Sequence, residues 1–75
     1  MIVMTETAQY SRTRIREVAE ARGIRLPWLA EQMGYSRAYL HLVLNGRRRI
    51  TPRFVRQACT ALGLPASVLF YNPEA

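Results

Sequence analysis

The sequence contains no lysine and no aspartate, and it has one cysteine, Cys59, and one histidine, His41. A single cysteine excludes a disulfide within the chain, and without partner ligands at the right spacing it makes no metal site. With one histidine and five glutamates, no acid–base pair or nucleophile cluster can be assembled, so we expect no enzyme and no cofactor. No apolar run approaches a membrane span, and the start Met1-Ile2-Val3-Met4 is too short for a signal peptide, which predicts a soluble intracellular protein.

Arginine alone carries the positive charge. Eleven arginines against five glutamates give a formal net charge of +6, which favours a polyanionic partner, either nucleic acid or an anionic membrane surface. Residues 1–31 hold five arginines and four glutamates, whereas residues 32–73 hold six arginines and no acidic residue. Arginine suits bidentate recognition of phosphate and guanine, and a GC-rich coding sequence would give the same bias. The excess charge lies in the second half of the chain.

Glycine, proline and capping residues divide the chain into helical segments, and no strand-like alternation is present. The 75 residues have room for one small domain. We predict an all-α fold, a compact bundle of four or five helices. The helices are expected at about 12–22, from 27 onward, at about 37–44, from 52 onward and within 65–70.

Three details of the first two helices are open to test. Ser11 is the expected N-cap of the first helix, with Tyr10 packing on Ile15. Trp28 is expected either as a partly buried anchor, which the usual burial of large aromatics favours, or as an exposed ring beside a ligand. The charged residues of the first helix are expected to be solvated, namely Arg12, Arg14, Arg16, Glu17 and Glu20.

Residues 29–46 have the pattern of two short helices joined by a tight turn. Ala30 is small where the helices would cross, Gly34 can adopt a positive φ, and Ser36 suits the N-cap of the second helix. Leu40, Val43 and Leu44 recur at i, i+3 and i+4, so the second helix directs them toward the core. The opposite face points outward and carries Ala38, His41, Leu42 and Asn45.

The run LAEQMGYSRAYLHLVLNGRRR, followed by TPRFVRQACTALGL, resembles the helix-turn-helix of lambdoid phage repressors and Cro proteins, also called the xenobiotic-response-element family. The resemblance covers roughly residues 12–71. It implies a small transcriptional repressor or regulator of phage, plasmid or bacterial type, in the bacterial cytoplasm or nucleoid. The expected organisation is a flexible N-terminal arm at 1–10, the DNA-binding domain at 11–72 and a tail at 73–75. The landmarks are Leu29-Ala30, Gly34, Ser36, Leu40, Val43, Asn45-Gly46, Pro52 and Ala61-Leu62-Gly63.

The resemblance implies that residues 36–45 enter the major groove of double-stranded DNA. There Arg37 would fork onto guanine, and Ala38 would meet a thymine methyl. Leu42 either contacts a base or packs against a protein partner. Arginines 47–49 and Arg53 are expected on the backbone or in the minor groove. The full expected DNA-binding set is Ser36, Arg37, Ala38, Tyr39, His41, Leu42, Asn45, Arg47, Arg48, Arg49 and Arg53.

Two further expectations concern partners. The alternative function is a protein-interaction module that docks a polymerase subunit or another repressor through Tyr35, Tyr39 and Leu42, and RNA binding is a weaker alternative. No small-molecule ligand and no membrane is expected. Since one helix reads only about 4 to 6 base pairs, we expect a homodimer, which can form mainly on DNA. The expected interface is Val68, Leu69, Phe70 and Tyr71, with Val68 and Leu69 partly closing the monomer core and Phe70 and Tyr71 more exposed.

Overall fold

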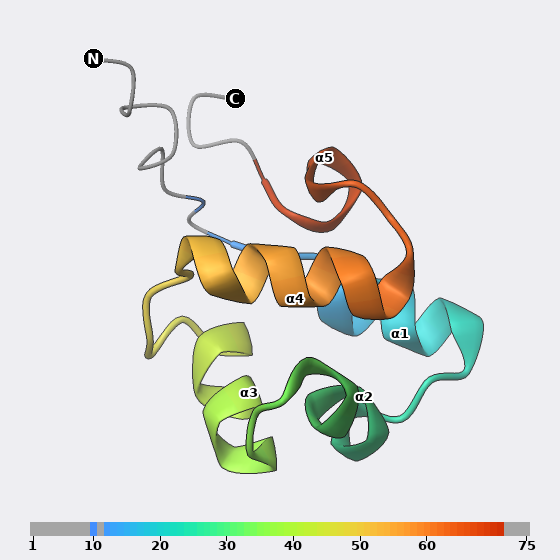
Figure 1. Cartoon of the computed structure of the whole chain (residues 1–75), viewed down its shortest axis with the longest axis horizontal. Helices are drawn as coiled ribbons and strands as arrows, with labels where there is room; N and C mark the ends of the chain where they lie inside the picture. The colour runs from blue at the N-terminus through green and yellow to red at the C-terminus, as the bar shows by residue number, and fades with distance from the viewer. Residues whose placement is uncertain (1–9, 11, 72–75) are drawn as a thin grey trace.

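The chain folds into five α-helices, with α4 crossing the middle of the molecule (Figure 1). The computed structural model describes residue 10 and residues 12–71. Over this part of the chain there is no strand beyond one isolated β-bridge, which confirms the all-α prediction. In chain order the helices are α1 (Ile15–Arg22), α2 (Leu26–Met33), α3 (Arg37–Leu44), α4 (Pro52–Leu62) and α5 (Ala66–Leu69).

A single apolar core joins the five helices. Phe54 of α4 is fully buried, and each of the other helices contributes a fully buried residue: Ile15, Leu29, Leu40 and Leu69. Burying a large apolar side chain contributes about 1.5–3 kcal/mol, whereas isolated helices of this length are unstable in water. Packing against α2 and burial in the common core, rather than helix propensity, therefore hold α3 in place.

Helices α3 and α4 begin as the sequence predicts. The Oγ of Ser36 accepts a hydrogen bond from the backbone N–H of Tyr39 at 3.0 Å. The Oγ1 of Thr51 accepts one from the N–H of Phe54 at 3.1 Å, and Pro52 occupies the first turn of α4. Each cap satisfies one of the donors that a helix N-terminus leaves unpaired. The segment between these caps, from Ser36 to Thr51, contains α3 and the basic loop at residues 47–49. Local interactions therefore define both of its ends.

The turn between α2 and α3 depends on Gly34, whose φ is 81°. A residue with a Cβ adopts this left-handed conformation only at a cost in free energy. The N–H of Gly34 donates to the carbonyl of Glu31 at 3.1 Å, and that of Tyr35 donates to Ala30 at 2.9 Å. These two bonds form a Schellman C-cap, after which the chain changes direction and starts α3 (Figure 1).

Helix α1 begins at Ile15, not near Arg12 as predicted. The N-cap residue is Arg14, which makes no side-chain capping bond. The side chain of Thr13, one residue earlier, accepts a hydrogen bond from the N–H of Ile15 at 3.0 Å. The predicted N-cap, Ser11, lies outside the described residues. Residues 12–14 do not join the helix, because their backbone groups have hydrogen-bonding partners elsewhere in the chain.

Those partners are residues 69–71, and we call this arrangement the terminal pairing. The N–H of Arg14 donates to the carbonyl of Leu69 at 2.7 Å, and the N–H of Tyr71 donates to the carbonyl of Arg12 at 3.0 Å. An antiparallel bridge joins Thr13 to residue 70 between them. A further helical turn at 12–14 would have to give up these bonds.

Phe70 is a core residue, so the prediction that it would be more exposed than Val68 is wrong. Phe70 is 1% exposed, and its ring lies edge-on to Phe54 with the centroids 6.3 Å apart. The ring of Tyr10 also packs on Phe70, with the two centroids 5.2 Å apart. Val68, by contrast, is 40% exposed. The physical reason is that residue 70 leaves α5 and enters the terminal pairing, so helical spacing no longer describes which side chain faces inward.

Candidate nucleic-acid interface

Helix α3 presents the outward face that its spacing predicts. Leu40 and Val43 are buried in the core, while Ala38 is exposed and His41 and Leu42 are partly buried. The small side chain of Ala38 leaves the backbone of α3 accessible at this point. The outward face therefore has short side chains at this point and is partly apolar, so another molecule can approach the helix backbone closely.

The N-terminal end of α3 is its most open part, because Ser36, Arg37 and Ala38 are all exposed. The oxygen of Ser36 accepts the capping hydrogen bond, so its hydroxyl hydrogen can be donated to an outside acceptor. The first N–H groups of a helix carry partial positive charge. Together with the guanidinium of Arg37, they favour a negatively charged or acceptor-rich partner.

Tyr39 belongs to an aromatic cluster and is not turned freely outward. Its ring lies 4.8 Å from that of Tyr35, and Tyr35 stacks on Phe54 at 5.6 Å. Burial raises the pKa of the Tyr35 phenol, and the positive charge of Arg53 opposes part of that rise. The guanidinium of Arg53 lies 5.8 Å from the Tyr35 ring centroid. The cluster thus connects the start of α3 to the start of α4.

The basic loop follows directly from the end of α3. Gly46 has a φ of 78°, and the N–H of Arg47 donates to the carbonyl of Leu42 at 2.8 Å. The side chains of residues 47–49 are all exposed, and Ile50 then returns to the core. Within the described residues these three arginines have no side-chain hydrogen bond, so their guanidinium groups face solvent.

Asn45 contacts a residue that sequence reasoning left in solvent. The Nη2 of Arg16, on α1, donates to the Oδ1 of Asn45 at 3.2 Å, and both residues are exposed. Arg16 therefore lies beside the C-terminal end of α3. The two positions are 29 residues apart, so no local pattern in the sequence indicates this contact.

Two other arginines predicted to be solvated have partners in the structure. The guanidinium carbons of Arg12 and Arg14 lie 4.5 and 4.2 Å from the centre of the Tyr71 ring. Cation–π contacts of this kind contribute about 0.5–1 kcal/mol at exposed sites. These arginines support the terminal pairing rather than the outward face of α3.

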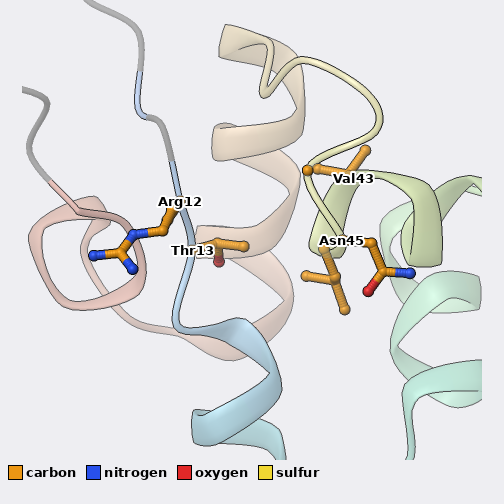
Figure 2. Close-up of a pocket in the computed structure, with 6 residues that line it drawn as sticks. Arg12, Thr13, Val43 and Asn45 are labelled. Atoms are coloured by element: carbon orange, nitrogen blue, oxygen red, sulfur yellow. The ribbon is translucent and has the colours of Figure 1, made fainter.

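A pocket of about 250 Å³ lies between the terminal pairing and the C-terminal end of α3 (Figure 2). Thr13, Val43 and Asn45 line it, and the guanidinium of Arg12 points away from Asn45. In the part of the chain that is described, no group of three or more metal-ligating side chains is present.

Trp28 is more open than a buried anchor. It is 48% exposed and, with Ile24 and Arg25, lines a shallow depression at the start of α2. About half of the side chain packs against the domain, so the structure lies between the two alternatives that the sequence offered. Its exposed part adds apolar surface outside α3.

Comparison with protein families gives one match, a family described as helix-turn-helix domain, over residues 12–69. This range contains all five helices and every residue of the expected DNA-binding set. Neither the curated proteins nor the solved structures give a match. Among the residues that the structure describes, no helix is both long and apolar enough to cross a membrane. The family indicates binding to DNA and is typically non-enzymatic. The chain belongs to the helix-turn-helix domain family.

Proposed function

We propose that this protein binds specific sites on double-stranded DNA and regulates transcription, as do the lambdoid repressors and Cro proteins that its sequence resembles. The observation that carries the proposal is the open N-terminal end of α3, where Arg37 and Ala38 are exposed beside uncapped backbone donors. In this class of protein, that end of the second helix contacts base edges in the major groove.

The distribution of charge supports contact with the DNA backbone. Residues 32–73 contain six arginines and no acidic residue, and residues 47–49 project from the loop that follows α3. Arg53, in the first turn of α4, lies over the ring of Tyr35. Arginines at both ends of α3 can therefore meet phosphates while the helix lies in the groove.

Base reading is assigned to the first outward residues. Arg37 can donate two hydrogen bonds to guanine, and the methyl group of Ala38 can meet a thymine methyl. Leu42 is partly buried, which leaves it a smaller role at a base edge. The protein-docking alternative has less support, because Tyr35 and Tyr39 already pack in the aromatic cluster and leave little apolar surface on this face.

We propose further that two copies bind a two-fold-symmetric site. Of the four residues expected at the interface, Leu69 and Phe70 are buried in the monomer, so the proposed contact is carried by Val68 and Tyr71. Such a dimer can form mainly on DNA. In binding isotherms, Val68→Arg is then expected to abolish cooperativity while the monomer stays folded.

Selection of duplexes from a random pool tests the proposal most directly. Enrichment of a motif is the expected outcome, and a palindromic motif with half-sites about 34 Å apart would support the dimer. Failure to enrich any motif, together with tight binding to a protein partner, would favour the protein-interaction alternative.

The salt dependence of affinity for the selected duplex provides a second test. Each neutralised phosphate contributes about −0.9 to the slope of log K against log salt, and the arginines of the interface suggest roughly four to six such contacts. Fluorescence anisotropy at several salt concentrations measures this slope. A slope near zero would contradict a DNA-binding function.

A further inference from the structure

The contact between Arg16 and Asn45 adds a residue of α1 to the face that α3 presents. Arginine has only donors, so the atom it meets at 3.2 Å must be the amide oxygen of Asn45. This contact orients the amide, and the NH₂ group of Asn45 is left to face another acceptor. The side-chain orientation at the end of α3 therefore depends on α1.

The partner of Arg16 is neutral, and this decides what the pair can bind. A carboxylate would cancel the charge of the guanidinium, whereas an amide oxygen leaves it in full. Arg16 retains further N–H donors, and Asn45 adds two. A concentration of donors with uncompensated positive charge on an exposed surface fits an anion.

We propose that Arg16 and Asn45 together bind a DNA phosphate at the C-terminal end of α3, with Arg16 both contacting the phosphate and positioning the Asn45 amide. The inference rests on the proposed DNA binding. Neither the sequence pattern of residues 29–46 nor the family match assigns Arg16 to the interface.

Arg16 and Asn45 lie at the C-terminal end of α3, and this position favours contact with the DNA backbone over contact with a base. Arg37 stands at the other end of this helix, about 12 Å from Asn45 along an axis that rises about 1.5 Å per residue. When the N-terminal end of the helix reaches base edges, its C-terminal end lies toward the rim of the groove, where phosphates are found. Asn45 at the rim then has no base edge to read.

The test compares Arg16→Gln with Arg12→Gln. Both substitutions remove one positive charge from neighbouring positions, but the guanidinium of Arg12 points away from Asn45 toward the Tyr71 ring (Figure 2). We expect Arg16→Gln to weaken binding to the selected duplex about tenfold and to reduce the magnitude of the salt slope by about 0.9. Arg12→Gln should leave the slope unchanged. Equal slopes for the two variants would overturn the proposal.

A double-mutant cycle tests the positioning role. We expect Asn45→Ala to weaken all duplexes alike in the parent, and to have a smaller effect when Arg16→Gln is already present. Additive effects would overturn the positioning role, and a changed preference at a single base pair would show that Asn45 reads a base. Circular dichroism and thermal melting check that each variant folds, which the exposure of both residues favours.

The proposed DNA binding and the role of Arg16 can be overturned separately. A parent protein that binds no duplex at any salt concentration overturns the proposed function and this inference together. A parent that binds with the expected salt dependence, but whose Arg16→Gln variant behaves like Arg12→Gln, overturns only the assignment of Arg16.

Discussion

Arginines on two sides of this small domain have different surroundings. On the side of the terminal pairing, Arg12 and Arg14 lie over the same ring, that of Tyr71. On the side of α3, Arg37 and residues 47–49 are exposed, with no side-chain hydrogen bond to any described residue. The residue type is the same in both places. Arg37 and residues 47–49 therefore remain available to an outside anion, whereas Arg12 and Arg14 are already engaged within the domain.

The difference separates two kinds of energy. A guanidinium that already lies over a ring contributes to the stability of the monomer, and moving it to a phosphate would give up that contact. A guanidinium in solvent contributes little to stability but releases bound counterions when it meets DNA. Substitutions on the first side should change the free energy of unfolding, and those on the second side should change affinity.

The largest effect is expected at Phe70. Phe70→Arg would place a charge in a site that is 1% exposed, at a cost above about 4 kcal/mol, which is comparable to the whole stability of a small domain. We expect loss of cooperative unfolding in urea, followed by circular dichroism. Val68→Arg, at an exposed position two residues earlier, should change the stability of the monomer by less than about 0.5 kcal/mol. Similar unfolding curves for the two variants would contradict the assignment of Phe70 to the core and Val68 to the surface.

An intermediate effect is expected on the α3 side. Arg37→Ala should lose roughly 1 to 3 kcal/mol of binding free energy on the preferred duplex and relax preference at one base pair. Arg48→Ala should weaken binding to all sequences alike, because a phosphate contact carries no sequence information. Anisotropy on a panel of single-base variants measures both, and urea unfolding should be unchanged. If both variants lost affinity uniformly, Arg37 would be a phosphate contact and specificity would come from DNA shape.

The smallest effect is expected at Tyr71. Tyr71→Leu keeps an apolar side chain but removes the ring beneath two guanidinium groups, so we expect a loss of about 0.5–1 kcal/mol in the free energy of unfolding. On a single half-site, where the proposed dimer contact plays no part, the salt slope of DNA binding should not change. A steeper slope would mean that Arg12 or Arg14 exchanges its ring contact for a phosphate, and the two sides would no longer be distinct.

Features that depend on a few neighbouring residues could be predicted from the sequence. The caps at Ser36 and Thr51 and the positive φ of Gly34 each involve residues within four positions, and the structure confirms all three. The exposure of Arg37 and of residues 47–49 also agrees with the pattern, because helical spacing separates inward from outward positions. Their contact with DNA stays a prediction.

Features that join distant residues could not be predicted. The side chain of Thr13 donates to the carbonyl of Leu69 across 56 positions, and this pairing delays the start of α1 and buries Phe70. Nothing near either residue indicates the other. The contact of Arg16 with Asn45 is of the same kind: a guanidinium on an amphipathic helix looks solvated until the neighbouring helix is placed. The helix-turn-helix motif could therefore be predicted from the sequence, whereas the terminal pairing and the Arg16–Asn45 contact could not.

The terminal pairing also sets the order in which the domain can be completed during synthesis. Phe70 fills the centre of the core, yet it is translated after every helix that packs around it. Until residue 70 has been added, Phe54 of α4 lacks the ring that packs edge-on against it. Because chains grow at about 5–20 residues per second, synthesis from Phe54 to Phe70 takes roughly one to three seconds. The helix-turn-helix is thus synthesised first, and its core is completed only when residue 70 joins the terminal pairing.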